Sequence, residues 1–298
     1  MGILVPINSF ISNSDMKRFL YKTLIYVVII LLIIVPVDFF KIYSHSYDFS
    51  VAGSEIYCAI NNSRKIRKAK KLILGDSVGH QLYPCEIDYD SIVSLACNQA
   101  ITLAGQYFLL KNYIENNVDS LPDEVVLFIT PFSLCNDVDK YAYHYFLKPF
   151  PPHKWSKFYT KHLKQRIHSI PLYWSANLPF IQTSNYTPEW ATPSSQSIKS
   201  ISPLSYEYLM KMDSITKQHD VSFRMVSTPI RDDRQIDIES FWYNLPPDYA
   251  VELNSLLIPY EESVYYMPSD YYLDHVHFLP DKIPFDYLGL LNDTTTQN

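Results

Sequence analysis

Short apolar runs alternate with helical patterns along the chain from residue 70 onward. Five of these runs are predicted to be strands, at residues 71–74, 91–96, 124–129, 221–228 and 263–267. Apolar residues at helical spacing predict helices over 103–117 and 203–219. Such alternation is typical of a parallel sheet covered by helices on both faces. We therefore expect an α/β fold in which ligands bind beyond the carboxyl ends of the strands.

An uncharged apolar segment, residues 23–37, precedes this region. As a helix rising about 1.5 Å per residue it covers only roughly 22 Å, so flanking aromatic residues must extend it across a bilayer core of about 30 Å. A cleaved signal peptide is the alternative, but the following residues lack the small side chains of a cleavage site. We expect a transmembrane helix over 18–41 and, because basic residues precede the span, a short cytoplasmic tail over 1–17.

The remaining chain is then predicted to lie on the outer side of an inner or plasma membrane. Residues 42–69 are expected to be a juxtamembrane linker, and residues 70–298 a periplasmic or extracellular domain. Residues 132–202 are longer than any ordinary connection and rich in aromatic and basic residues. This insertion is predicted either to cover the strand ends, to face the membrane or a partner, or to pack its rings into a small core.

Composition narrows the class of protein. The chain has 298 residues, a formal net charge of −6 and 47% hydrophobic residues, which excludes a disordered chain and a disulfide-dense miniprotein. A mildly acidic chain is a poor candidate for a nucleic-acid binder, so we expect no nucleic-acid partner. Its four cysteines leave one or two disulfides and buried free thiols as open alternatives.

The first predicted strand runs directly into Gly75-Asp76-Ser77. A serine that follows a buried parallel strand lies at the carboxyl edge of the sheet. If a helix begins there, its unpaired N–H groups can stabilise a developing oxyanion. The alternative is that Asp76 and Ser77 only cap that helix.

Asp274 and His277 follow the last predicted strand and, being three residues apart, lie on one side of a turn. A nucleophilic serine needs a histidine as general base and a carboxylate to orient it. The alternatives are a surface Asp–His pair and a metal site built from Asp274, His275 and His277. The other candidate ligands, Asp76 and His80, match the spacing of no common site, so we expect neither a metal nor a cofactor.

GDS after the first strand and D-x-x-H near the carboxyl terminus together resemble two blocks of the SGNH/GDSL hydrolase superfamily, over about residues 70–290. The resemblance implies a flavodoxin-like three-layer sandwich with a five-stranded parallel sheet. It implies Ser77 as the nucleophile, His277 as the base and Asp274 as the carboxylate that orients the base. It gives His275 no role.

The family's other two blocks supply oxyanion donors. The resemblance implies Asn98 and Gly105 as the second block, about two residues longer than the usual register. The third block normally reads G-x-N-D, but here Thr130-Pro131-Phe132-Ser133 follows the third strand, so its asparagine is missing. Asn136 and Asp137 lie a few residues later. Loss of one oxyanion donor can cost on the order of 10²–10³ in rate.

Membrane-anchored members with an atypical third block resemble accessory acyl-transfer proteins of envelope polysaccharide pathways, such as those of teichoic acid D-alanylation and alginate acetylation. The resemblance implies serine-dependent acyl transfer or ester hydrolysis, with an O-acetyl or similar small acyl group, on a cell-envelope or extracellular polysaccharide. It implies an acylated carbohydrate or acyl donor, the membrane and a membrane-bound O-acyltransferase as partners. The alternatives are a plain tethered esterase and a catalytically inactive scaffold or glycan-binding module.

Overall fold

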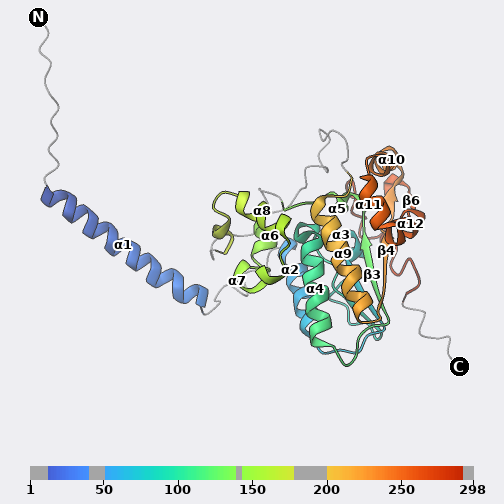
Figure 1. Ribbon diagram of the computed structural model, residues 1–298, viewed down its shortest axis with the longest axis horizontal. Coiled ribbons are helices and arrows are strands. Elements are labelled where there is room, and N and C mark those ends of the chain that lie inside the picture. The colour runs from blue at the N-terminus through green and yellow to red at the C-terminus, as the bar shows by residue number, and fades with distance from the viewer. Residues whose placement is uncertain (1–12, 40–50, 139–142, 178–199, 291–298) are drawn as a thin grey trace, which may run out of the picture.

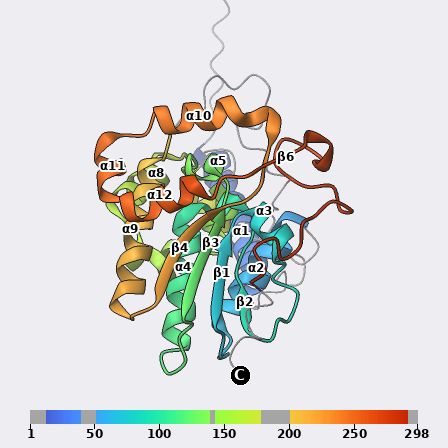
Figure 2. The same cartoon turned by 90° about the vertical axis from the view of Figure 1, so that its right-hand side faces the viewer.

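A parallel sheet of four strands forms the centre of the protein (Figures 1 and 2). The computed structural model describes residues 13–39, 51–138, 143–177 and 200–290. The sheet has the order β2-β1-β3-β4, with all neighbours parallel. Its strands are β1 (Lys71–Gly75), β2 (Ile92–Ser94), β3 (Glu124–Ile129) and β4 (Ser222–Ser227).

The strands form because β1, β2 and β3 are nearly continuous apolar runs, as expected for strands covered on both faces. Leu72 and Val125 pair across β1 and β3 and are fully buried. Further along the same pair, Gly75 lies opposite Phe128. The carboxyl ends of β1 and β3 therefore end at one edge of the sheet, followed by Asp76 and Thr130.

Helices cover both faces of the sheet. On one face α2 (Val51–Arg64), α4 (Thr102–Asn116) and α9 (Pro203–Gln218) pack side by side. In Figure 2 the strands lie in front of α4, and α3 (Ser77–Leu82) and α12 (Asn254–Glu262) lie toward the viewer. The helices predicted over 103–117 and 203–219 are confirmed as α4 and α9, within one residue at each end.

The fifth predicted strand, 263–267, does not join this sheet. Its last two residues form β6 (Tyr266–Met267), which pairs with β5 (Ile230–Arg231) in a separate two-stranded parallel sheet. A strand inside a parallel sheet is apolar on both faces, but Tyr265 is 55% exposed. The hydroxyl of Ser263 accepts the amide of Ser227 at 2.8 Å, so a side chain covers the end of β4. The predicted five-stranded sheet is therefore wrong by one strand.

Two helices lie in the amino-terminal region, where a transmembrane helix and a linker are predicted. Helix α1 (Asn13–Phe39) precedes the domain, but no helix in the described residues is both long and apolar enough to cross a membrane, so the transmembrane helix predicted over 18–41 is not supported. Residues 1–12 and 40–41 of these predictions lie outside the described ranges. Within the predicted linker, 42–69, α2 buries Ile56 and Ile60 against the core. This part of the linker therefore belongs to the domain.

The insertion at 132–202 begins in α5 (Pro131–Leu134) and continues through α6 (Tyr143–Leu147), α7 (Pro152–Trp155) and α8 (Lys161–Ser169). Its rings gather on Phe108 of α4: Trp155 and Tyr159 stack on it at 5.2 and 5.7 Å between centroids. Such pairs contribute about 0.5–1.5 kcal/mol each beyond burial. The described rings therefore pack onto the main core, while residues 178–199 lie outside the described ranges. Helices α10 (Gln235–Tyr243) and α11 (Pro247–Glu252) connect β5 to α12.

Candidate active site

The site begins at Gly75, where β1 ends. A Cβ atom at this position would lie 2.3 Å from the carbonyl oxygen of Phe128, so only glycine allows β1 and β3 to approach this closely. The side chain of Gln106 on α4 donates from Nε2 to the Gly75 carbonyl at 2.6 Å. The position of the strand end, and of the two residues that follow it, is therefore fixed from both sides.

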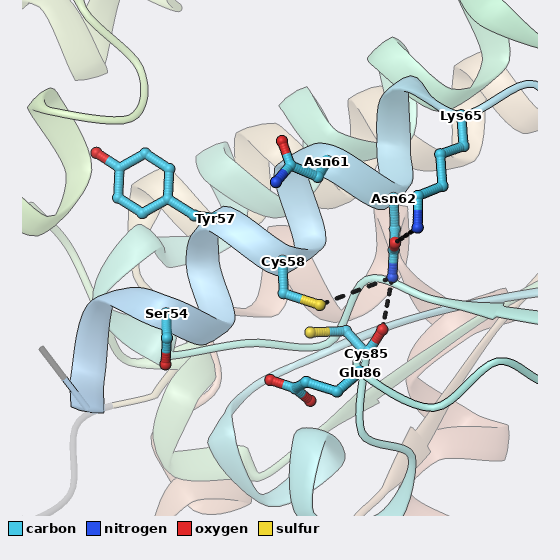
Figure 3. Close-up of a pocket in the computed structure, with 8 residues that line it drawn as sticks. All are labelled: Ser54, Tyr57, Cys58, Asn61, Asn62, Lys65, Cys85 and Glu86. Atoms are coloured by element: carbon cyan, nitrogen blue, oxygen red, sulfur yellow. Dashed lines mark hydrogen bonds between the residues drawn. The ribbon is translucent and has the colours of Figure 1, made fainter. Parts of the chain in front are cut away.

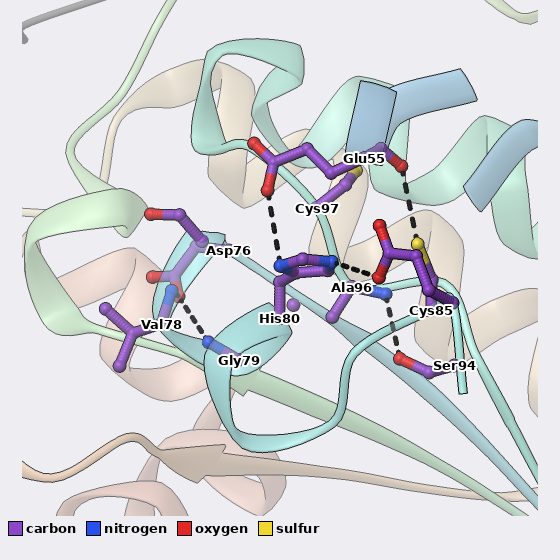
Figure 4. Close-up of polar contacts among 12 residues, drawn as sticks. Glu55, Asp76, Val78, Gly79, His80, Cys85, Ser94, Ala96 and Cys97 are labelled. Carbon is purple, nitrogen blue, oxygen red and sulfur yellow. Dashed lines mark hydrogen bonds and ion pairs between the residues drawn. The ribbon is translucent and has the colours of Figure 1, made fainter. Parts of the chain in front are cut away.

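Asp76 is the N-cap of α3 and is buried. Its Oδ1 accepts the amides of Val78 and Gly79 at 3.0 and 3.1 Å, the latter drawn in Figure 4. Its Oδ2 accepts the Thr130 amide at 2.9 Å and the Ser133 hydroxyl at 2.7 Å. One carboxylate thus caps the helix and holds it against the end of β3. Ser77 is thereby placed at the first position of α3.

Ser77, His277 and Asp274 form a continuous chain of hydrogen bonds. The Ser77 Oγ lies 2.8 Å from Nε2 of His277, and Nδ1 of His277 lies 2.8 Å from Oδ2 of Asp274. The second carboxylate oxygen of Asp274 accepts the amides of Val276 and His277 at 2.8 and 2.7 Å. The structure thus brings together the three residues that the resemblance implied as a triad.

The segment that carries the histidine is fastened to the helix that carries the serine. Gln81 of α3 accepts the Phe278 amide at 3.0 Å and donates to the Phe278 carbonyl at 3.2 Å. Phe278 itself is buried and stacks on Tyr272 at 4.6 Å. The residue after the histidine is therefore held in place by both a polar and an apolar contact.

The protonation states favour a general base at His277. Burial by itself would lower the pKa of His277, but the hydrogen bond and charge of Asp274, with the charges of Asp76 and Glu55, outweigh it and raise that pKa. Burial would raise the pKa of Asp274, yet the hydrogen bonds from His277 and the Val276 amide hold it well below its usual range. Asp274 is therefore an anion that, once His277 is neutral, fixes the imidazole proton on Nδ1 and leaves Nε2 to accept one.

The predicted oxyanion donors are placed unequally. Asn98 caps the short 3₁₀ helix 99–101, its Oδ1 accepting the Ala100 amide at 2.9 Å, and its side chain also bonds the Glu55 carboxylate. Glu55 also interacts electrostatically with His277. Gly105 does not present its amide as predicted. It is buried inside α4, where its N–H follows the helix geometry toward Ile101.

The third block has a structural role here. Thr130 and Ser133 both bond Asp76, and they take the place of the missing asparagine in the sequence. Asn136 does not move into the site: it is buried, and its amide donates to Gln99 at 3.1 Å. The hydroxyl of Ser133 also reaches Gln99, at 2.8 Å. These side chains stabilise the sheet edge behind the serine.

The alternative metal site on the D-x-x-H segment is not formed. His275 interacts electrostatically with Asp233, whereas the imidazole that bonds Asp274 is that of His277. Within the described residues, three metal-ligating side chains converge elsewhere, around Cys58. His275 is thus separate from the triad, as the resemblance implied.

The sequence does not predict the full roles of two acidic residues at the site, Asp76 and Glu55. The sequence predicts Asp76 as a helix cap but not its bonds to the residues that follow β3. The polar Thr130 and Ser133 after a buried strand are the signal that indicates these bonds. Glu55 comes from the segment predicted as a linker, and nothing in the sequence marks it. Burial raises the pKa of Glu55, against the opposing effects of His80 and Asn98.

No family model matches the chain, and no curated protein matches it. Among solved structures, one similar chain is a protein from Streptococcus pneumonia provisionally named a platelet activating factor. It shares 12% sequence identity, with 85% of this chain and 98% of that chain covered, at a TM-score of 0.34. A likeness this distant carries no argument about function, so a function for this chain must rest on the geometry of its own site.

Proposed function

We propose that the protein is a serine-dependent esterase or acyltransferase. The observation that carries this proposal is the unbroken chain from Ser77 through His277 to Asp274, with 2.8 Å at each side-chain contact. A nucleophile bonded to a base, and a base oriented by a carboxylate, are the arrangement that activates a serine. A serine that only capped a helix would not need the second and third members.

The reaction follows from these contacts. As Oγ of Ser77 forms a bond to the acyl carbonyl carbon, its proton passes to Nε2 of His277, and Asp274 stabilises the imidazolium. The tetrahedral intermediate then expels its alkoxide, which takes that proton and leaves as an alcohol. Water or a sugar hydroxyl next gives its proton to His277 and attacks the acyl-serine, which releases Ser77 and the acid or new ester.

The oxyanion is proposed to bind the Ser77 amide and the Asn98 side chain. The first amides of a helix have no acceptor within it, and Asp76 takes those of Val78 and Gly79. The Ser77 N–H is thus the amide at the start of α3 that is left for an oxyanion. Asn98 is proposed as the second donor because its Oδ1 caps residues 99–101 and its side chain also bonds Glu55, which interacts electrostatically with His277.

The proposed substrate is a small acyl ester, such as an O-acetyl group, on a cell-envelope or extracellular polysaccharide. In support of a bulky acceptor, the side chains of His277 and Asp274 are 33% and 48% exposed, so the triad opens to solvent. A polymer can approach such a site with one substituent. Transfer to a sugar hydroxyl beside a membrane-bound O-acyltransferase is the finer form of the proposal, and hydrolysis of the same ester is the simpler one.

Labelling with a fluorophosphonate tests the proposed nucleophile. We expect the folded wild-type protein to be labelled, and Ser77→Ala and His277→Ala to lose the label because the nucleophile or its base is absent. His275→Ala is the matched control, since its imidazole lies next to the triad in sequence but outside it, and it should label like wild type. Equal labelling of Ser77→Ala and wild type would refute the mechanism.

Ester preference tests the proposed substrate. We expect the protein to release acetate from an O-acetylated polysaccharide. We also expect it to hydrolyse an aryl acetate faster than an aryl ester of a long-chain fatty acid. Activity confined to long-chain esters would favour a lipase over this proposal. The second candidate function, an inactive scaffold or glycan-binding module, is favoured by the loss of Gly105 and the third-block asparagine as donors. It predicts no labelling of a well-folded protein that still binds polysaccharide.

A further inference from the structure

Three side chains that can ligate metal converge at a place distinct from the triad. Cys58 lies on α2, and Cys85 and Glu86 lie just after α3. One ligand atom from each lies within 4.8 Å of the others. Figure 3 shows the two sulfur atoms facing each other, with the Glu86 side chain beside them, in a pocket of about 340 Å³. No sequence motif marks this group, because 27 residues separate the two cysteines.

The two cysteine-bearing segments are fixed relative to one another. Asn62, one turn after Cys58 on α2, donates from Nδ2 to the Cys85 carbonyl at 2.7 Å and to the Ser94 carbonyl at 3.3 Å. Cys85 is also buried, and its thiol lies 3.6 Å from the Glu55 carbonyl. Side chains held in this way do not need to be ordered by a ligand.

Glu86 is oriented by a partner of its own. Nε2 of His80 lies 2.9 Å from Oε2 of Glu86. Nδ1 of the same ring lies 3.4 Å from Oε2 of Glu55, a contact drawn in Figure 4. A carboxylate that binds a metal ion is commonly hydrogen-bonded by a second side chain that orients it. His80 can orient Glu86 in this way.

A positive charge lies at the same pocket. Lys65 lines it together with Cys58, Cys85 and Glu86. Two thiolates and one carboxylate around a divalent ion would leave one net negative charge, which the Lys65 amine offsets. Binding of the ion would release the protons of the two thiols.

We propose that Cys58, Cys85 and Glu86 form a site for a thiophilic divalent metal ion, of which Zn²⁺ fits best. Tetrahedral Zn²⁺ with bonds of about 2.3 Å places two sulfurs roughly 3.8 Å apart. Ligand atoms already within 4.8 Å of one another therefore need to move by no more than about 1 Å. Two sulfurs exclude the hard ions Ca²⁺ and Mg²⁺, which prefer oxygen ligands. The pocket leaves the fourth position to water.

Cobalt titration of the reduced, chelator-treated full-length protein tests the site. We expect one equivalent of Co²⁺ to produce a thiolate-to-cobalt charge-transfer band, and Zn²⁺ to abolish it by displacement. Cys58→Ser should lose the band. Cys135→Ser is the matched control, because Cys135 is a half-buried cysteine outside the group, and it should keep the band at full intensity. Since Cys58→Ser can affect folding, the exposed Glu86 supplies a second variant: Glu86→Gln should keep a weaker band and bind Co²⁺ at least tenfold less tightly.

Three results would overturn the proposal. One is the absence of a charge-transfer band in folded, reduced wild-type protein. Another is a band of equal intensity and affinity in Cys58→Ser. The third is a Cys58–Cys85 disulfide in the protein as purified, found by mass spectrometry without reduction, together with no metal uptake after reduction. The labelling of Ser77 does not enter this test, so the metal site and the proposed function stand or fall separately.

Discussion

Replacing Asp274 with asparagine tests the orientation of the base most directly. The change keeps the shape of the side chain and alters only which atoms donate. Oδ1 of Asp274 accepts the amides of Val276 and His277. An asparagine keeps its oxygen there, because the opposite rotamer would place its NH₂ group, which cannot accept a hydrogen bond, against these two amide donors.

That rotamer sets the tautomer of the histidine. The new NH₂ group would lie opposite Nδ1 of His277, 2.8 Å from the present Oδ2. Nδ1 must then accept, so the imidazole carries its proton on Nε2, facing Ser77, and cannot act as a base. Loss of the correct tautomer costs on the order of 10⁴ in kcat, or about 5 kcal/mol of transition-state stabilisation. The half-exposed pair contributes no more than about 1 kcal/mol to folding.

The assay is steady-state hydrolysis of an aryl acetate at a pH where the wild-type histidine is neutral, with urea unfolding in parallel. We expect kcat of Asp274→Asn to fall on the order of 10³–10⁴-fold while the unfolding midpoint changes little. Asp270→Asn is the matched control, since Asp270 is an exposed residue of the same segment that lies outside the hydrogen-bond chain, and it should behave as wild type. A folded Asp274→Asn protein within tenfold of wild-type kcat would refute the reasoning.

Three further predictions concern the same sheet edge. Gly75→Ala should lower the free energy of unfolding in urea by about 1–3 kcal/mol or more, because its Cβ would lie 2.3 Å from the Phe128 carbonyl oxygen; an unchanged urea midpoint would contradict this. Asp76→Ala should cost about 2–4 kcal/mol in the same assay, from about 1 kcal/mol of lost capping plus unpaired buried donors; a loss below about 1 kcal/mol would show that these bonds contribute little. The pH profile of kcat/KM should rise as His277 loses its proton, and because its pKa is raised, the midpoint should lie above the ordinary histidine value of about 6.5; a midpoint at or below that value would contradict the assigned partners.

The central strands could be predicted because their signal is local. Residues 124–129 and 71–74 are apolar at nearly every position, which is what burial on both faces of a parallel sheet requires. The segment 263–267 has a similar composition, with two adjacent tyrosines, and so carries the same signal. What decides its place is tertiary: Ser263 covers the end of β4, and the chain then pairs with Ile230 and Arg231. A pattern of apolar positions cannot contain that information.

The proximity of Ser77, His277 and Asp274 could be predicted, and so could Asn98 as a proposed oxyanion donor, but the place of Gly105 inside α4 could not. Ser77 and His277 are defined by side-chain chemistry next to predicted strand ends, so short motifs are enough to find them. Oxyanion donors depend on where a helix begins. The glycine at position 105 indicated a special backbone conformation, yet it lies within α4, and the left-handed φ of 56° belongs to Thr102, where that helix starts. Such a conformation favours glycine, so the sequence points to the wrong residue.

The charges around His277 act in opposite ways on the two charges that the proposed reaction creates, the imidazolium and the oxyanion. Asp274, Asp76 and Glu55 all raise the pKa of that imidazole, and they therefore stabilise the imidazolium that forms when Ser77 loses its proton. The same negative groups oppose the oxyanion that forms in the same step. The proposed oxyanion donors are neutral: the Ser77 amide and the Asn98 side chain. The Asn98 side chain is also hydrogen-bonded to Glu55. Burial raises the pKa of Glu55. Protonation of Glu55 would remove a negative charge that opposes the oxyanion, and it would also remove one that stabilises the imidazolium of His277. In the proposed reaction, the charge of Glu55 on α2 would thus act both on the imidazolium and on the oxyanion.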